Sequence, residues 1–174
     1  MFKGAMTAIV TPFKKDESID EQALRGLINF QLKNGIDGIV PCGTTGESPT
    51  LDYEEHEEVI EIVIDAVNGK VPVIAGTGSN STKEAIEMTK KAADAGADAS
   101  LQVCPYYNKP TQEGLFRHFS AIAKAVDIPI VVYNIKGRTV INMETSTLAR
   151  LAKEHSNIVG VKEASGDINQ MQDV

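Results

Sequence analysis

Tryptophan is absent from this sequence of 174 residues, and aromatic residues make up only 5% of it. The two cysteines, Cys42 and Cys104, are too few for a disulfide framework and favour a reducing compartment. No run of about 18 apolar residues predicts a membrane-spanning helix. The first seven residues lack the charged start and long apolar run of a signal peptide. We therefore expect a cytoplasmic protein that does not associate with a membrane.

A surplus of basic residues is also missing, because 17 basic residues stand against 24 acidic ones for a net charge of −7. This balance argues against a nucleic-acid partner. The three histidines, His56, His118 and His155, fall on expected helices without cysteine or carboxylate neighbours at ligand spacing. We therefore expect neither a metal site nor a cofactor.

Short apolar, β-branched runs alternate with amphipathic stretches along the whole sequence, and hydrophobic residues make up 42% of it. The strand-to-strand repeat of about 30 residues is that of a βα unit. Strands that are apolar throughout are typical of a parallel sheet covered by helices on both faces. We expect strands at 8–10, 38–40, 71–75, 99–103, 128–133 and 158–162.

Capping residues mark the beginnings of several expected helices. Asp20 begins the first, and Thr111 is a plausible cap of a later one. Two pairs at the capping-box spacing, in which each side chain bonds the other residue's backbone N–H, precede the helices between them. They are Asp52 with Glu55 and Ser81 with Glu84.

No linker or low-complexity stretch divides the sequence, so residues 1–174 are expected to form a single domain. Six strands fit either a doubly wound parallel sheet or an incomplete (β/α)8 barrel, whose usual length is about 250 residues. Periodicity alone does not decide between the two. In both folds the functional residues lie at the carboxyl ends of the strands.

Polar and reactive residues gather at these expected strand ends. Lys162 closes an apolar run and should lie at the edge of an apolar interior, where desolvation lowers the pKa of an amine and a neutral amine attacks carbonyl groups. A lysine that extends to solvent is the simpler alternative. Ser100, Gln102 and Cys104 lie two apart and share one face of a strand, which is unusual if that face is buried.

Three further features are open to two interpretations each. The Gly43-Thr44-Thr45-Gly46 turn suits a carboxylate or a phosphate, or is an ordinary loop. Tyr133 is either a proton relay or a packed strand aromatic. Arg138, in an expected glycine-containing loop, either clamps a carboxylate or is solvated.

These motifs together resemble the dihydrodipicolinate synthase family of pyruvate-dependent class I aldolases. The resemblance covers the chain in order. It rests on Ala8-Ile9-Val10-Thr11-Pro12-Phe13, Gly43-Thr44-Thr45-Gly46-Glu47-Ser48, the stretch Pro72 to Gly78, Pro105-Tyr106-Tyr107-Asn108-Lys109-Pro110, Tyr133-Asn134, Gly137-Arg138-Thr139 and Val161-Lys162-Glu163-Ala164. It implies a (β/α)8 TIM barrel, here truncated after about six strands. The barrel would stay open or rearrange to a doubly wound parallel sheet.

The resemblance also implies an activity. Pyruvate would form a Schiff base with Lys162, and the enamine would condense with L-aspartate-4-semialdehyde to give 4-hydroxy-tetrahydrodipicolinate for lysine and diaminopimelate biosynthesis. Thr44 and Thr45 would hold the pyruvate carboxylate. Thr45 and Tyr133 would relay protons with Tyr107, which the family donates from a neighbouring subunit of a homo-oligomer, a dimer or larger.

Arg138 would bind the carboxylate of the semialdehyde. A lysine feedback site would map onto Ser48, His56, Asn80, Glu84 and Tyr106, although Pro49 and Tyr53 depart from the family pattern. Two alternatives follow from the resemblance. One is a structural barrel fragment, shortened or redesigned, without turnover. The other is a sister pyruvate aldolase acting on sialic acid or sugar acids, which Arg138 and the tyrosine pair disfavour.

Overall fold

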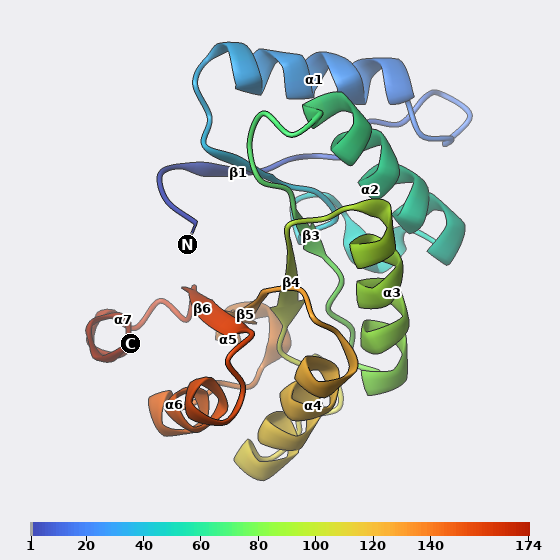
Figure 1. Cartoon of the computed structure of the whole chain (residues 1–174). Coiled ribbons are helices and arrows are strands. Elements are labelled where there is room, and N and C mark those ends of the chain that lie inside the picture. The colour runs from blue at the N-terminus through green and yellow to red at the C-terminus, as the bar shows by residue number, and fades with distance from the viewer. Residues whose placement is uncertain (1) are drawn as a thin grey trace. The chain divides into compact units, whose positions relative to one another are not determined.

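The computed structural model describes residues 2–174, in which strands and helices alternate as predicted (Figure 1). The elements are β1 (Met6–Ala8), α1 (Glu21–Lys33), β2 (Gly38–Val40), a 3₁₀ turn η1 (Ser48–Thr50), α2 (Tyr53–Val67), β3 (Ile74–Gly76), α3 (Thr82–Ala95), β4 (Ala99–Val103), α4 (Gln112–Ala125), β5 (Ile130–Asn134), α5 (Lys136–Thr139), α6 (Thr145–Glu154), β6 (Ile158–Glu163) and α7 (Ile168–Asp173). No helix among these residues is long and apolar enough to cross a membrane.

The chain divides into two compact units, which we call unit 1 (residues 2–76 and 91–99) and unit 2 (residues 77–90 and 100–174). In unit 1, β1 pairs in parallel with β2, and β2 meets β3 through a bridge between Ile39 and Val73. Helices α1 and α2 supply fully buried side chains to the core of this unit, among them Leu24, Ile28 and Val63. Each such side chain contributes roughly 1.5–3 kcal/mol through burial.

In unit 2, β4, β5 and β6 lie side by side in parallel order, with α4 and α6 on the same side of them (Figure 1). The core of this unit lies between these strands and helices and includes Phe119 of α4, Ile130 and Val132 of β5, and Leu151 of α6. The register of β6 against β5 shifts by one residue after Ile130. Within residues 2–174, β6 pairs with β5 only, so no closed barrel forms there.

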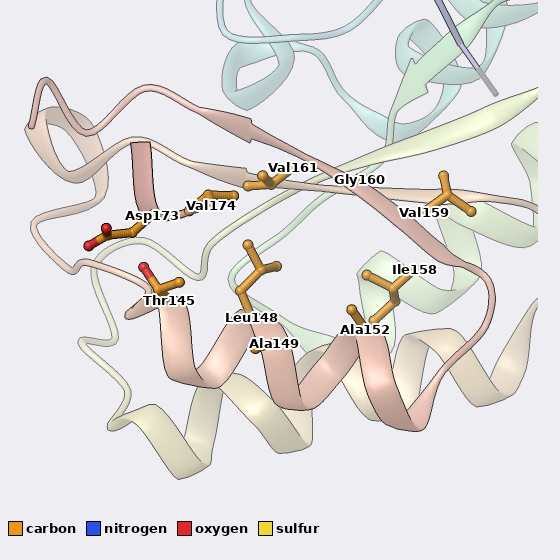
Figure 2. Close-up of a pocket in the computed structure, with 10 residues that line it drawn as sticks. All are labelled: Thr145, Leu148, Ala149, Ala152, Ile158, Val159, Gly160, Val161, Asp173 and Val174. Atoms are coloured by element: carbon orange, nitrogen blue, oxygen red, sulfur yellow. The ribbon is translucent and has the colours of Figure 1, made fainter. Parts of the chain in front are cut away.

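A groove of about 260 Å³ runs between α6 and the open side of β6. Figure 2 shows Leu148 of α6 pointing up toward the strand, and Val161 lines the groove from β6. The lining is mostly apolar, with Asp173 and Val174 of the α7 end closing one side. Lys162 is not among the lining residues.

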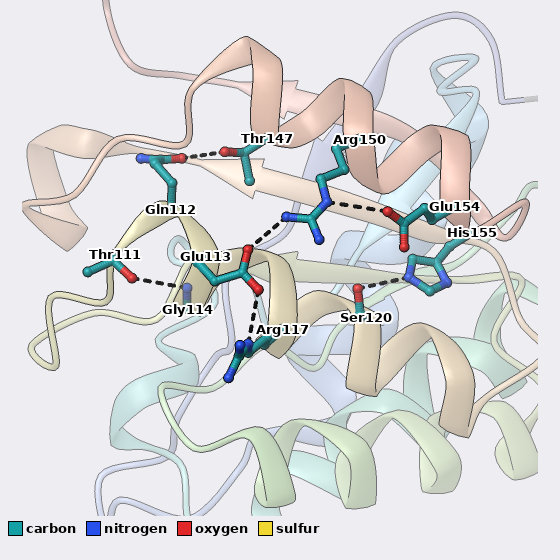
Figure 3. Close-up of polar contacts among 10 residues, drawn as sticks. All are labelled: Thr111, Gln112, Glu113, Gly114, Arg117, Ser120, Thr147, Arg150, Glu154 and His155. Atoms are coloured by element: carbon teal, nitrogen blue, oxygen red, sulfur yellow. Dashed lines mark hydrogen bonds and ion pairs between the residues drawn. The ribbon is translucent and has the colours of Figure 1, made fainter.

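The outer surfaces of α4 and α6 are joined by a chain of polar contacts (Figure 3). Arg150 binds Glu113 at 2.7 Å and Glu154 at 3.3 Å, and its guanidinium carbon lies 3.4 Å from the centre of the Phe116 ring. Because the charged groups are exposed, each ion pair contributes little to stability. The stacked Phe116 ring gives the contact additional packing.

Most of the predicted helix beginnings are confirmed. Asp20 accepts a hydrogen bond from the backbone of Ala23, Thr111 caps α4, and Asp52 with Glu55 forms a complete capping box. The Ser81–Glu84 box is only half formed. Glu84 N–H donates to Ser81 Oγ at 3.4 Å, but the Glu84 carboxylate accepts from Ser79 Oγ instead of from the backbone of Ser81.

The polar face predicted for β4 is buried, and a hydrogen-bond network compensates for that burial. The amide Nε2 of Gln102 lies within 2.9 Å of hydroxyls of Thr77, Thr89 and Ser100, and Thr89 Oγ1 donates to the carbonyl of Ala85 at 2.6 Å. Both Ser100 and Gln102 are 0% exposed. The network satisfies the hydroxyls, and within this network of described residues the Gln102 side-chain carbonyl is the atom that lacks a partner.

Candidate active site

The carboxyl ends of β5 and β6 bring together two of the residues in unit 2 for which the sequence predicts chemistry. Tyr133 and Lys162 are direct partners across the two strands, and Lys162 Nζ lies 4.3 Å from the centre of the Tyr133 ring. The tyrosine is only 4% exposed, so its ring is fixed by packing. A cation over an aromatic face is attracted to it, which holds the lysine amine close to the tyrosine.

The expectation that Lys162 lies at the edge of an apolar interior is wrong for the residues described, because its side chain is exposed. The reason is the open side of β6, which has no further strand beside it within residues 2–174. Val159 of the same strand is 46% exposed for the same reason. The alternative expectation, a lysine that extends to solvent, describes Lys162 better.

On the opposite face of the same strand ends, Asn134 and Glu163 form a second pair, for which the sequence predicted no role. Asn134 Nδ2 donates to Glu163 Oε2 at 2.9 Å. Burial raises the pKa of the Glu163 carboxyl, but hydrogen bonds from Asn134, Ser165 and Gln170 together hold that pKa below its usual value. The carboxylate is therefore a stable acceptor one residue from Lys162.

Arg138 lies on the single-turn helix α5 and not in the expected loop. A backbone bond from Val140 N–H to the Lys136 carbonyl closes the turn, and Val140 ends it in the left-handed conformation. The Arg138 side chain is exposed, and no carboxylate of residues 2–174 lies within salt-bridge distance of it. A cation in this setting is available to an anionic ligand.

Tyr107 follows β4 and is 88% exposed, with a left-handed backbone φ of 69°. A large aromatic side chain with this exposure contributes little to the core of its own unit. A tyrosine exposed in this way is free to contact another chain. Its neighbour Tyr106 is half-buried.

In unit 1, the Gly43–Ser48 segment forms a compact turn after β2. Gly46 N–H donates to the Gly43 carbonyl at 3.1 Å, and Thr11 Oγ1 donates to the Gly46 carbonyl at 2.7 Å. Thr44 is half-buried and Thr45 is exposed, so the hydroxyl of Thr45 is open to a ligand. The turn is thus held by its backbone, and both threonine side chains remain without an internal hydrogen bond in the described residues.

Close packing of the neighbouring strand fixes this turn further. A Cβ atom on Gly76 would lie 2.1 Å from the carbonyl oxygen of Cys42, so only glycine allows β3 to approach here.

Burial raises the pKa of the Cys42 thiol to about 12, and that of the Cys104 thiol of unit 2 also to about 12. Both thiols are therefore unreactive packing groups.

The residues implied for lysine feedback divide between the units. Ser48 and His56 belong to unit 1, and His56 is 3% exposed with neither ring nitrogen bonded to another described residue. Asn80, Glu84 and Tyr106 belong to unit 2, where Asn80 and Asn108 exchange hydrogen bonds. Burial lowers the pKa of His56, which keeps the ring neutral.

No cluster of histidine, cysteine and carboxylate side chains suited to a metal ion occurs in the described part of the chain. His56 and His118 lie on α2 and α4 as expected, whereas His155 follows the last residue of α6. There the His155 Nε2 atom lies 2.8 Å from Ser120 Oγ. This histidine therefore joins two helices.

The sequence profile of the dihydrodipicolinate synthetase family matches residues 1–174. The chain belongs to this family. A curated relative from Syntrophus aciditrophicus (strain SB), named 4-hydroxy-tetrahydrodipicolinate synthase, is 67% identical over 174 residues. This alignment covers 100% of the chain and 59% of that protein, so the chain spans about three fifths of the length of such dihydrodipicolinate synthetase relatives.

Solved structures of the family share the fold. The chloride-inhibited dihydrodipicolinate synthase of Acinetobacter baumannii, complexed with pyruvate, has a TM-score of 0.95 and 51% identity over 98% of this chain and 58% of its own. A dihydrodipicolinate synthase variant described as monomeric has a TM-score of 0.96 and 46% identity over 99% of this chain and 57% of its own. The predicted α/β class is thus confirmed as the N-terminal portion of the family's TIM barrel.

Proposed function

We propose that this chain carries the pyruvate-condensing centre of a 4-hydroxy-tetrahydrodipicolinate synthase, with Lys162 as the Schiff-base lysine. The observation that supports this most is the amine of Lys162 against the ring of Tyr133 at the carboxyl ends of two parallel strands. Active sites of barrel enzymes lie at these strand ends. The pyruvate complex of the Acinetobacter baumannii relative supports the choice of substrate.

The chemistry begins with the neutral amine of Lys162. Its nitrogen attacks the keto carbon of pyruvate, and loss of water leaves an imine. The imine draws electrons from the methyl group, which loses a proton and becomes an enamine carbon. That carbon attacks the aldehyde of L-aspartate-4-semialdehyde, and attack of the semialdehyde's amino group on the imine carbon then releases Lys162 and the cyclic product.

Three hydroxyl side chains support the proton transfers in this proposal. Tyr133 has a hydroxyl on the residue that contacts Lys162, and its buried ring limits its motion. Thr45 would join it, and the exposed Tyr107 would come from a neighbouring copy in a homo-oligomer, a dimer or larger. A chain of hydroxyls can pass a proton between substrate and solvent. Each hydrogen bond in the chain holds the next donor and acceptor within reach and so lowers the barrier to the transfer.

Two groups would hold the substrate carboxylates. Thr44 and Thr45 offer hydroxyls on a backbone-locked turn for pyruvate. The guanidinium of Arg138, which has no ion pair within residues 2–174, would hold the carboxylate of the semialdehyde by two parallel hydrogen bonds. Lysine feedback would act through Ser48, His56, Asn80, Glu84 and Tyr106, of which His56 is buried and would need to become exposed to touch lysine.

The second candidate is a barrel fragment that folds but does not turn over substrate. The exposure of Lys162 favours it, because a solvated amine is less nucleophilic at neutral pH than a desolvated one. The edge of β6 that has no neighbouring strand within residues 2–174 favours it too, since an uncovered site admits water.

Reduction with borohydride in the presence of pyruvate separates the two candidates. We expect a stable pyruvyl adduct on Lys162, located by peptide mass spectrometry. The matched control is Lys153→Met, an exposed lysine of α6, which should leave labelling unchanged, whereas Lys162→Met should abolish it. A folded wild-type chain that gains no adduct, or gains it equally on Lys153, would establish the fragment without turnover.

A further inference from the structure

The one-residue register shift in β6 decides which face of the sheet carries Lys162. Ile158 pairs with Ile130, but the next pair is Gly160 with Val131, so Val159 has no partner on β5. Side chains alternate between the two faces of a strand, and each skipped residue reverses the alternation. Everything after Val159 is therefore on the face opposite to the one that regular pairing would give.

The burial of the strand agrees with this reversal. Ile158 faces the core beneath α6 and is 5% exposed. In an unshifted strand Lys162, four residues later, would share that face. With the shift, Val161 takes that side and lines the groove with Leu148 (Figure 2), while Lys162 lies beside Tyr133 on the other side.

A network of hydrogen bonds fastens the strand ends in this shifted register. The two oxygens of Glu163 accept from Asn134 Nδ2 at 2.9 Å, from Gln170 Nε2 at 3.0 Å and from the Ser165 backbone N–H at 2.7 Å. All three donors belong to segments that end or follow β5 and β6. The carboxylate thus joins the ends of both strands and the N-terminal half of α7.

Asn134, the last residue of β5, is bound just as completely by segments outside its strand. Its Nδ2 also donates to Asn142 Oδ1 at 2.8 Å, its Oδ1 accepts from the backbone of Met143 at 3.0 Å, and its carbonyl accepts from Ala164 N–H at 2.8 Å. It is 1% exposed. An amide with every one of these groups satisfied in a buried site fixes one orientation of its strand end.

We propose that Glu163 and Asn134 are positioning residues, which hold the shifted register and so keep Lys162 against Tyr133. They act from the opposite face of the sheet and do not touch the amine in the described contacts. Their importance for catalysis rests on the proposed function, because only then does the placement of Lys162 set a reaction rate. The placement itself is a separate, measurable property.

The test compares Glu163→Gln with Glu154→Gln, the same chemical change at an exposed ion pair of α6. In Glu163→Gln one acceptor oxygen becomes an N–H₂ donor that faces another donor, so at least one bond is lost. The first measurement needs no substrate. Protons of the Lys162 side chain above the Tyr133 ring should show an upfield ring-current shift and a nuclear Overhauser effect to that ring by NMR.

We expect both NMR signals in the wild-type chain and in Glu154→Gln, and their loss in Glu163→Gln. Borohydride trapping of pyruvate on Lys162 should slow by roughly 10- to 100-fold in Glu163→Gln, because small misplacements of a reacting group have effects of this size. The pyruvate concentration at half-maximal trapping should stay the same. Signals and trapping that match the wild type would overturn the positioning role.

The two proposals fail in different ways. In one outcome the wild-type chain shows the NMR contact, Glu163→Gln loses it, and pyruvate is trapped on Lys162 in neither protein. The positioning role then stands and the proposed function is wrong. If Glu163→Gln does not fold, as judged by circular dichroism, Gln170→Ala replaces it and removes one donor from the carboxylate. An unchanged Lys162–Tyr133 contact in folded Gln170→Ala would then overturn the proposal.

Discussion

The two faces of the β5–β6 strand ends are held in different ways. On one face Lys162 is exposed and its described contact is the Tyr133 ring. On the other, Asn134 and Glu163 are bound by backbone and side chains of the segments that follow both strands. The comparison shows that one face of a strand end can carry a lightly held side chain while the other face is fixed by many hydrogen bonds.

The largest effect on the lightly held face should come from Tyr133→Phe. The ring and its contact with Lys162 are kept, but the hydroxyl proposed to relay protons is lost. We expect exchange of the pyruvate methyl protons with solvent deuterium, followed by NMR, to slow by about 100-fold or more. Unchanged exchange in a chain that still forms the Lys162 adduct would remove Tyr133 from the relay.

On the tightly packed face, Leu151→Ala should mainly lower stability. Leu151 of α6 is 0% exposed and belongs to the core beneath β5 and β6. We expect the free energy of unfolding in urea to fall by about 2–5 kcal/mol. Under conditions where the variant stays folded, pyruvate trapping on Lys162 should be close to that of the wild type. Equal losses of stability and of trapping would show that packing on one face of the strands also sets the reactivity of Lys162 on the other.

Acid should also weaken the packed side, through His118 of α4. Burial lowers the pKa of His118 to about 4, and its Nδ1 lies 2.8 Å from Thr82 Oγ1. The unfolded state, with a pKa near 6.5, takes up a proton first, so stability is complete above about pH 6.5 and falls toward pH 4. The loss between pH 6.5 and 5 should be about 2 kcal/mol.

Urea unfolding at pH 7 and pH 5 measures this loss, with His118→Gln as the control because it does not titrate. The urea midpoint of the control should fall less than that of the wild type over the same interval. His56, whose pKa is lowered by burial, adds to the loss in both proteins. An equal fall in both proteins would exclude His118 as a source of the pH dependence.

The smallest effect should come from Glu154→Gln at the surface of α6. The carboxylate lies 3.3 Å from Arg150, which keeps Glu113 as its second partner (Figure 3). We expect a change of about 0.5 kcal/mol or less in the free energy of unfolding. A loss above about 1 kcal/mol would mean that the α4–α6 contacts act as a cooperative network.

Local patterns in the sequence predict much of this fold. The strands Gly38–Val40 and Ala99–Val103 occur as predicted, because apolar β-branched runs bounded by helix caps leave few alternatives. The strands near β3 and β5 begin two or three residues later than expected. Proline occupies the early part of both runs at Pro72 and Pro129, and it lacks the N–H that a strand ladder needs.

The site was predictable to a different extent. Tyr133 and Lys162 stand out because reactive side chains end apolar runs, and the structure makes them neighbours. Their shared face depends on the register shift at Val159, which alternation in the sequence does not reveal. The partners Asn142 and Gln170 have no motif of their own, since single polar residues in loops and short helices are common. Asn134 and Glu163 both lie in motifs that carry the family resemblance, but no chemical role was expected of either.

Because Val159 of β6 has no partner on β5, this strand tolerates the loss of a residue better than the gain of one. Removal of Val159 would leave the pairs Ile130 with Ile158 and Val131 with Gly160 in regular succession, so Lys162 would stay opposite Tyr133. An added residue between Gly160 and Lys162 would turn the lysine to the other side of the sheet. A deletion and an insertion in this strand therefore have different effects on the face that carries Lys162. For redesign of the family, a shorter β6 is the starting point that keeps Lys162 opposite Tyr133.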